Sequence, residues 1–107
     1  MWVHFDHATS GLNPEAIEAL EDWVKSLGDA SGKGRWQVTG HTDVSGPPAI
    51  NKALSQLRAE VVAAWLQTRL GLVLTSLEVR GMGSGLPCCE DDRLNRRVEV
   101  LWVPSLQ

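Results

Sequence analysis

The stretch GHTDVSGPPAINKALSQLRAEVV, residues Gly40–Val62, decides how the rest of the chain is interpreted. Its first residues are typical of a strand end, and the glycine and prolines that follow are typical of a turn. Because proline has no backbone N–H for a sheet ladder, we expect the strand to end before Pro47. We predict a helix over residues 49–70 that ends at Gly71.

This stretch places an acid and a base on either side of the turn. Asp43 lies in the turn, and Arg58 lies in the expected helix. A carboxylate and a guanidinium held side by side can bind the opposite charges of a zwitterion, and the guanidinium fork suits a carboxylate better than lysine does. The same two side chains could instead form a structural ion pair, with the acid capping the turn.

The helix over 49–70 has an apolar stripe, which we predict to pack on the core. At about 100° per residue, the stripe comprises Ile50, Leu54, Leu57, Val61 and Trp65. The flank beside the stripe comprises Asn51, Ser55, Arg58 and Val62. A polar group on such a flank would be partly desolvated and still accessible to a ligand. Lys52, Gln56 and Glu60 point elsewhere, as a solvated face does.

Length and composition indicate one globular domain over residues 1–107. Apolar residues make up 43% and charged residues 21%, and the net charge is −3, so there is no basic surface for nucleic acid or an anionic membrane. No apolar run approaches the roughly 20 residues that span a bilayer. Met1 leads directly into an expected strand, without a visible signal peptide. The sequence is therefore that of a cytosolic protein or of a domain excised from a longer one.

The remaining periodicities predict three more strands and another helix. Asn13 and Pro14 are typical of a helix start and Gly28 of its end. The expected strands cover residues 2–5, 36–40, 77–82 and 97–103, with a link over 29–34 and a loop over 83–92. The order βαβαββ indicates an α/β (α+β) two-layer sandwich with a mixed four-stranded sheet. Two crossovers imply at least one parallel pair, and the last two strands can pair antiparallel.

Other chemistry-bearing residues give weaker signals. Adjacent Cys88 and Cys89 could bridge only through a strained eight-membered ring, so we expect two free thiols in a loop. His41 and Asp43 are too few to bind a metal ion. With Ser55 they would complete a hydrolase triad, but no nucleophile turn or oxyanion glycine flanks that serine. The glycines of 81–85 are not followed by a helix, which disfavours a phosphate loop. We expect no enzyme activity, no metal and no cofactor.

Three motifs together resemble the OmpA-like C-terminal domain family. They are GHTDxxG over 40–46, NxxLSxxRAxxV over 51–62 and NRRVEV over 95–100, in the family's order. This family includes peptidoglycan-associated lipoproteins, flagellar stator B subunits and envelope parts of type VI secretion. The resemblance covers nearly the whole chain. It implies the βαβαββ fold, which agrees with the periodicities.

The resemblance also implies a function and a site. Members of this family bind cell-wall peptidoglycan non-covalently through the diaminopimelate residue of the stem peptide. By resemblance, Asp43 would bind the side-chain ammonium of diaminopimelate and Arg58 its carboxylate. The rest of the pocket would comprise Thr42, Val44, Gly46, Asn51, Leu54 and Arg97. Lysine-type peptides lack this carboxylate, so we expect the site to discriminate against them.

The same resemblance implies a place in the cell. We expect a domain excised from a larger outer-membrane or envelope protein, located in the periplasm of a Gram-negative bacterium. It would contact the membrane only through the parent protein, and it could form a homodimer. Many relatives have an aromatic residue and then an acid where this chain has His7 and Ala8, and a longer loop where it has the acidic loop over 83–95. An alternative is therefore a structural module that kept the fold and lost the ligand.

Overall fold

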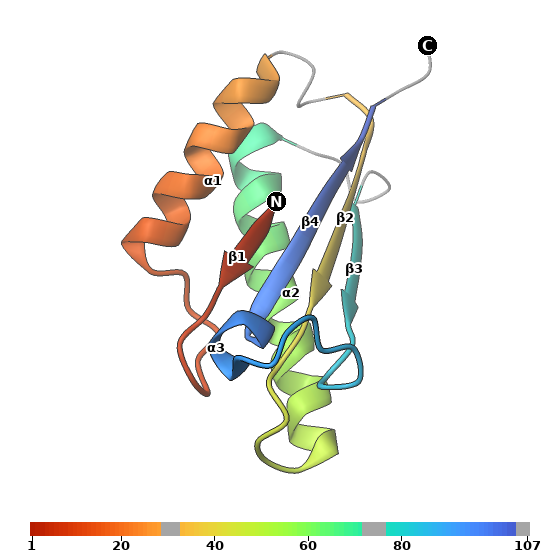
Figure 1. Cartoon of the computed structure of the whole chain (residues 1–107). Coiled ribbons are helices and arrows are strands. Elements are labelled where there is room, and N and C mark those ends of the chain that lie inside the picture. Colours follow the sequence, from red (N-terminus) through yellow and green to blue (C-terminus); the bar gives the residue numbers. More distant parts are fainter. Residues whose placement is uncertain (29–32, 72–76, 105–107) are drawn as a thin grey trace.

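The computed structural model describes residues 1–28, 33–71 and 77–104, and its elements follow the expected order (Figure 1). They are β1 (Trp2–His4), α1 (Pro14–Leu27), β2 (Arg35–Gly40), α2 (Pro48–Leu70), β3 (Leu77–Gly81), α3 (Asp92–Asn95) and β4 (Arg97–Val103). The single-turn helix α3 was not predicted. The link expected over 29–34 lies partly outside the described residues. Among the described helices, none combines the length and apolar character that crossing a bilayer requires.

The sheet is mixed, with the strand order β1-β4-β2-β3. β2 and β3 are parallel, whereas β4 runs antiparallel to both β1 and β2. The predicted mixed sheet and parallel pair are therefore confirmed. The expected pairing of the last two strands is wrong, because β2 lies between them: Val38 has Val79 as its partner on one side and Val100 on the other.

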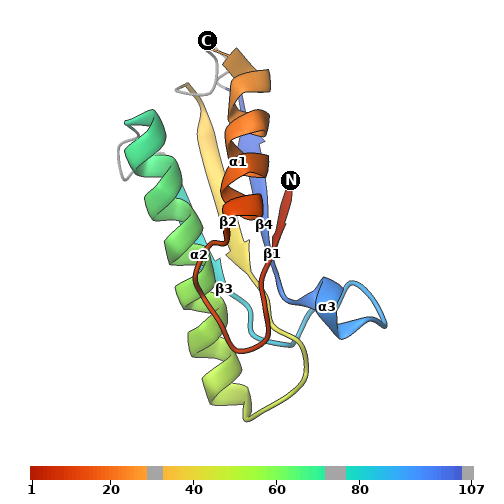
Figure 2. The same ribbon diagram turned by 90° about the vertical axis from the view of Figure 1, so that its left-hand side faces the viewer.

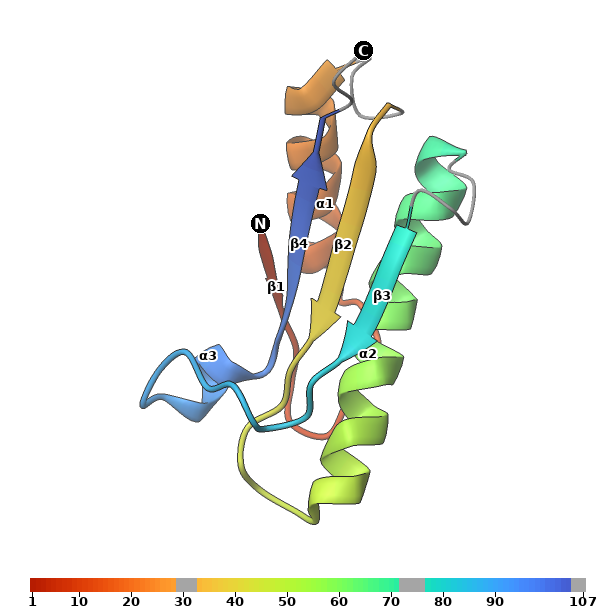
Figure 3. The same ribbon diagram turned by 90° about the vertical axis from the view of Figure 1, so that its right-hand side faces the viewer.

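Both long helices cover the same face of the sheet, and the opposite face carries no helix of comparable length (Figures 2 and 3). The core lies between these two layers. Its largest side chain is Trp36 of β2, which is completely buried and meets Trp23 of α1 edge to face, with ring centroids 5.5 Å apart. The predicted start of α1 is confirmed, since the Asn13 side chain accepts a hydrogen bond of 2.8 Å from the Ala16 amide.

Two glycines let α2 lie directly against the sheet. A Cβ atom added to Gly40 at the end of β2 would lie 1.9 Å from the Ser55 carbonyl oxygen. One added to Gly81 at the end of β3 would lie 2.4 Å from the Gln56 amide nitrogen. The Ser55 hydroxyl strengthens this contact, because it accepts a hydrogen bond of 2.8 Å from the Gly83 amide.

The predicted orientation of α2 is wrong. Its buried residues are Asn51, Ser55, Arg58, Ala59, Val62, Ala63 and Leu66, so the predicted flank faces the core. In the predicted core stripe, Ile50 is 60% exposed and Leu57 is 49% exposed, although Trp65 does pack against the core. The close approach at the two glycines explains this orientation, because Gly40 and Gly81 let the backbone of Ser55 and Gln56 lie against the sheet.

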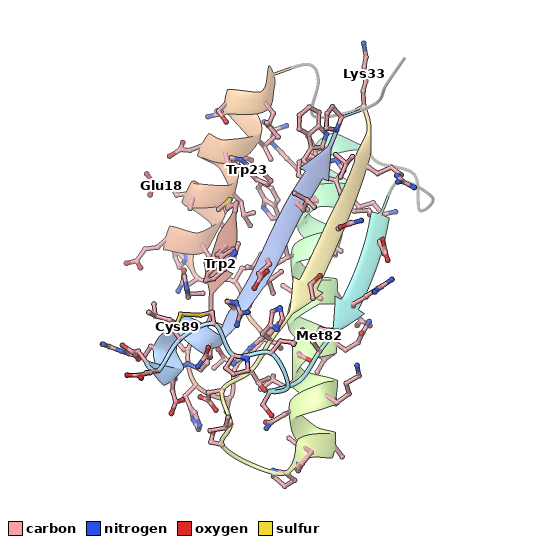
Figure 4. All side chains as sticks on the ribbon, turned by 45° about the vertical axis from the view of Figure 1, so that its right-hand side comes forward. Trp2, Glu18, Trp23, Lys33, Met82 and Cys89 are labelled. Carbon is pink, nitrogen blue, oxygen red and sulfur yellow. A yellow bond between two sulfur atoms is a disulfide. The ribbon has the colours of Figure 1, made fainter. Side chains whose placement is uncertain are left out.

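The expectation of two free thiols is also wrong. Cys88 and Cys89 form a disulfide, visible as the yellow bond beside Cys89 in Figure 4. Both cysteine amides donate to the Asn95 side-chain oxygen, at 2.8 and 3.2 Å, and the Asn95 amide group donates to the Cys89 carbonyl at 2.8 Å. The side chain of one asparagine thus fixes the turn in which the neighbouring sulfur atoms meet.

Candidate ligand-binding site

A cavity of about 230 Å³ lies where the turn after β2, the first turns of α2 and the segment after β1 meet. Six of the residues predicted for the site line it: Thr42, Asp43, Gly46, Asn51, Leu54 and Arg58. The structure adds His7, Ala8, Ser45, Ile50 and Arg96 to the lining. Val44 and Arg97 are not part of it; the Val44 side chain is 66% exposed.

Arg58 is completely buried, and backbone carbonyl groups hold its guanidinium. Nε donates to Thr9 at 2.7 Å and Nη2 to Asp6 at 3.1 Å, in the segment after β1, while Nη1 donates to His41 at 3.1 Å. A guanidinium has five N–H groups, so one on each terminal nitrogen has no partner in the described part of the chain. No described carboxylate forms an ion pair with Arg58.

Arg58 keeps its charge despite this burial. Desolvation is the largest effect on the pKa of Arg58; the nearby Asp43 opposes it and the charge of Arg96 adds to it, and together these effects lower the pKa to about 10. A pKa near that value leaves the guanidinium protonated at neutral pH. The cavity therefore contains two arginines and one ionised acid, and this excess of positive charge suits a ligand that carries a carboxylate.

Asp43 is paired with Arg96 rather than with Arg58. One carboxylate oxygen accepts hydrogen bonds from the Ser45 amide, at 3.0 Å, and from the Ser45 hydroxyl. The other oxygen accepts from Arg96 Nη1 at 3.3 Å. Burial alone would raise the pKa of Asp43, but the bonds from Ser45 and Arg96 together lower it below its ordinary value. Asp43 is therefore ionised, and the structural pair with Arg58 is replaced by one with Arg96.

The two neighbouring arginines of the NRRVEV motif have different surroundings. Arg96 Nε donates to the Phe5 carbonyl at 3.0 Å and reaches the cavity. Arg97 lies away from the cavity, where it donates to Glu99 at 2.6 Å and to the Leu86 carbonyl at 3.1 Å. Arg96, which follows α3 and immediately precedes β4, therefore lines the cavity where Arg97, the first residue of β4, was expected to do so.

The segment after β1 reaches across the cavity. His7 Nε2 lies 3.3 Å from the Ser45 hydroxyl oxygen on the opposite wall. Ala8 has a φ of 56°, which is in the left-handed region that alanine rarely adopts. On the cavity floor, the buried Thr42 hydroxyl has no hydrogen-bond partner among the described residues. Because Thr42 lines the cavity, this hydroxyl is a candidate contact for a ligand.

The residues considered for other chemistry have structural roles. The Ser55 hydroxyl is buried and occupied, since it donates to the Lys52 carbonyl at 2.8 Å and accepts from the Gly83 amide. His41 Nε2 lies 3.5 Å from a Glu99 oxygen, on the side of Arg97 rather than beside Ser55. The described residues contain no group of three or more His, Cys, Asp or Glu side chains that could hold a metal ion.

The comparison with known families agrees with the fold. The model of the OmpA family matches residues 4–99, which include Asp43, Arg58 and all of the NRRVEV motif except Val100. The chain belongs to the OmpA family. The match covers β2 and β3 completely, but only the last residue of β1 and the first three residues of β4.

Several characterised members of the OmpA family are similar to this chain. The outer-membrane lipoprotein YfiB of Pseudomonas aeruginosa is 32% identical over 96% of this chain and 62% of its own length. The peptidoglycan-associated lipoprotein of the same organism is 35% identical over 91% and 59%. The cell wall anchor of the T6SS from Pseudomonas aeruginosa superposes with a TM-score of 0.79 at 26% identity, covering 97% of this chain and 80% of that one.

The relatives also indicate the compartment and the size of the whole protein. They are outer-membrane or peptidoglycan-associated proteins, and this places the domain in the periplasm, within the cell envelope. The chain spans between 33% and 62% of the length of the first three curated relatives.

Proposed function

We propose that this domain binds cell-wall peptidoglycan without covalent chemistry and anchors a larger envelope protein to the wall. Membership in the OmpA family supports the anchoring role. So do two relatives, one called a peptidoglycan-associated lipoprotein and the other a cell wall anchor. The limited share of each curated relative that the chain covers supports a longer parent protein.

We infer that the ligand is the meso-diaminopimelate residue of the stem peptide. Its side chain presents an ammonium and a carboxylate on one carbon atom. The observation that carries this inference is the cavity itself, in which ionised Asp43 and the spare N–H groups of Arg58 occur together. Asp43 would bind the ammonium, and the two terminal nitrogens of Arg58 would bind the two carboxylate oxygens.

The neighbouring residues complete this assignment. The Thr42 hydroxyl is the free polar group beside Asp43, because the Thr42 amide already donates to the Gly83 carbonyl at 2.9 Å. Val44 would contribute only its backbone, since its side chain is exposed. Gly46, Asn51 and Leu54 form the wall, and Arg96 takes the place first assigned to Arg97.

The expected affinity is modest. Each charge-assisted hydrogen bond contributes about 1.5–3 kcal/mol, less the cost of ordering the ligand. One site would therefore bind a free peptide with a dissociation constant of about micromolar to millimolar. Many identical peptides on one cell wall, and several domains on one assembly, would raise the effective affinity.

A second candidate function is a structural module that has lost the ligand. The observation in its favour is that protein groups already occupy both charges: Ser45 and Arg96 bind Asp43, and three carbonyls accept from Arg58. The His7 and Ala8 departures lie in the segment that covers Arg58. A domain with this function would fold normally and bind no peptide.

Calorimetric titration separates the two candidates. We expect heat of binding with a tripeptide whose third residue is meso-diaminopimelate, and at least about tenfold weaker binding with the lysine tripeptide, which leaves Arg58 without its carboxylate. In a pull-down with isolated sacculi, Asp43→Ala and Arg58→Ala should each lose retention while circular dichroism shows a folded domain. If neither peptide binds, the module that lost its ligand is correct. If both variants are retained like the wild type, the site is wrongly assigned.

A further inference from the structure

The disulfide between adjacent Cys88 and Cys89 lies at the surface, in the loop between β3 and α3 (Figure 4). Cys88 is exposed and Cys89 is half-buried, and the flanking residues Pro87 and Glu90 are exposed as well. An external thiol can therefore reach the bond. Exposed disulfides are reduced more readily than buried structural ones, and regulatory disulfides are found among them.

The Asn95 side chain connects this disulfide to the ligand cavity. It is buried, and it accepts from both cysteine amides and donates to the Cys89 carbonyl. The next residue is Arg96, which lines the cavity and donates from Nη1 to Asp43 at 3.3 Å. One peptide bond therefore separates the residue that holds the disulfide turn from a residue of the ligand site.

The single-turn helix α3 provides a second connection. The Arg96 amide donates to the Asp92 carbonyl at 3.3 Å, so α3 holds the backbone of Arg96. A helix of one turn is not stable by itself, because its formation fixes several residues for one hydrogen bond. The position of Arg96 therefore depends on the contacts of Asn95, the last residue of α3, with the disulfide turn.

We propose that the Cys88–Cys89 disulfide is a reversible redox site that controls the position of Arg96 and, through Arg96, the affinity of the ligand cavity. The bond restricts the backbone of both cysteines, because adjacent residues can be bridged only within an eight-membered ring. Reduction removes this restriction, and Asn95 then binds a turn that can open. Cys88 Sγ lies 3.6 Å from the Leu94 carbonyl oxygen, which is an acceptor for the thiol of the reduced form.

The adjacency of the two cysteines determines the class of reductant. An attacking thiolate forms a mixed disulfide with one sulfur atom and releases the other as a thiolate. The released group belongs to the neighbouring residue, so it expels a monothiol before a second molecule arrives. A dithiol displaces the cysteine with its own second thiol: the dithiol is oxidised to a disulfide, and each cysteine takes up one electron and one proton. The site therefore requires a dithiol, such as the paired thiols of an oxidoreductase.

Reduction should weaken ligand binding, an effect that rests on the proposed function. In the oxidised form, Arg96 is held by the Phe5 carbonyl and by Asp43. When α3 loosens, Arg96 loses its fixed position in the cavity wall, and the ligand must order it again. Ser45 still binds Asp43, so the loss is partial. We expect the affinity for the diaminopimelate tripeptide to fall about fivefold.

Amide hydrogen exchange of the whole chain tests the control of Arg96 without a ligand. Dithiothreitol should expose two titratable thiols per chain where the oxidised form has none. Exchange at the amides of Cys88, Cys89 and Arg96 should then become at least about tenfold faster. Exchange at Val38, which pairs with strands on both sides, should stay unchanged, because the opening is local. The proposal is overturned if no thiol appears, if Arg96 exchanges equally in both forms, or if Val38 changes as much as Arg96.

A monothiol is the control for the reductant. At equal concentrations of thiol groups, dithiothreitol should reduce the disulfide and 2-mercaptoethanol should leave most of it intact. Equal reduction by both compounds would overturn the requirement for a dithiol.

Calorimetry with and without dithiothreitol tests the effect on the ligand. The reduced wild type should bind the diaminopimelate tripeptide about fivefold more weakly than the oxidised form. The double variant Cys88→Ser, Cys89→Ser should bind like the reduced wild type under both conditions. Equal affinities of the two wild-type forms, or a response of the double variant to dithiothreitol, would overturn the effect on the ligand. If no peptide binds in either form, the proposed function fails, while the exchange of Arg96 still decides whether the disulfide controls this residue.

Discussion

Arg58 and Arg97 are both buried, and they have opposite surroundings. Arg97 is paired with Glu99, covered by the Leu86 carbonyl and stacked 4.9 Å from the centre of the Trp2 ring. Arg58 also lies over an aromatic ring, that of Phe5 at 5.3 Å, but backbone carbonyls bind it and no described carboxylate neutralises it. Arg97 lies outside the cavity lining, whereas Arg58 forms part of it.

The difference suggests a criterion for separating a candidate ligand-binding arginine from a structural one. A buried charge is costly unless it is paired, so a neutralised arginine needs no ligand. Carbonyl groups orient a guanidinium and leave its net charge available. A buried arginine with oriented N–H groups, no ion pair and a neighbouring cavity is therefore the better candidate for binding an anion.

The largest expected effect comes from replacing each arginine with lysine. Lysine cannot present two parallel N–H groups to a carboxylate, so Arg58→Lys should weaken diaminopimelate tripeptide binding by about 30-fold, or about 2 kcal/mol. Arg97→Lys should change affinity by less than about twofold and lower the free energy of unfolding by about 1–2 kcal/mol, since it loses bonds to Glu99 and Leu86. Calorimetry and urea denaturation measure the two quantities. The reverse result would mean that the two arginines have been assigned the wrong roles.

A smaller effect is expected for the acids that accompany the two arginines. Asp43→Asn should weaken tripeptide binding about tenfold, because it removes the partner of the ammonium, and Glu99→Gln should leave binding unchanged.

The pKa of Asp43 in the folded state is lowered from 3.8, so its contribution to stability is present above that pH and is lost as the pH falls through the folded pKa. Acid denaturation curves should show this loss in the wild type and not in Asp43→Asn. If the wild type and Asp43→Asn give equal acid denaturation curves, Asp43 does not contribute an ionised carboxylate to the stability of the folded domain.

His41 gives a pH dependence to the surroundings of Arg97. Burial and the charge of Arg97 lower the pKa of His41 from 6.5, and Glu99 opposes them. The unfolded chain therefore binds a proton at this residue more readily, and the free energy of unfolding should fall as the pH decreases through 6.5 toward the folded pKa. Urea denaturation at about pH 7.5 and 5.5 measures this change in the free energy of unfolding. His41→Gln should show a smaller pH dependence than the wild type; an equal dependence would assign the effect to other groups.

The smallest effect concerns the segment that covers Arg58. Ala8 has a φ of 56°, so Ala8→Gly should relieve backbone strain and raise the free energy of unfolding by about 0.5–1 kcal/mol. The matched control is Ala53→Gly on the exposed surface of α2, which should destabilise the domain by a similar amount. Thermal denaturation of both variants measures the two changes in stability. If Ala8→Gly destabilises the protein, the left-handed conformation of this residue is not its conformation in solution.

The strands and both long helices could be predicted because periodicity and end residues agree along the chain. Asn13 and Gly28 bound α1 as expected, and β2 alternates about Trp36 and Val38 as expected. Most of the cavity lining could also be predicted, because the family motif fixes residue types at the turn and in α2. These are local signals that need no knowledge of distant partners.

Missing the disulfide between adjacent Cys88 and Cys89 was a local error, but the wrong face of α2 and the missed contacts of Arg58 concern partners that are distant in the sequence. Hydrophobicity alone assigned the wrong face of α2 to the core, because it cannot show that Ser55 and Arg58 find hydrogen-bond partners when buried. Arg96 was missed in favour of Arg97 because a motif does not state which of two adjacent residues faces the turn. The spare N–H groups of Arg58 depend on carbonyls far away in the chain, and no sequence pattern indicates them.

The contact of α2 with Gly40 and Gly81 has a consequence for how this domain could evolve. At both glycines the sheet lies against the backbone of α2, at Ser55 and Gln56, so a larger residue there would meet backbone atoms rather than a flexible side chain. A methyl group at either glycine would clash with α2 and push the helix that carries Arg58 away from the turn that carries Asp43. New ligand preferences should therefore arise at the rim, at positions such as His7 and Ile50, while the spacing of the charged groups stays unchanged.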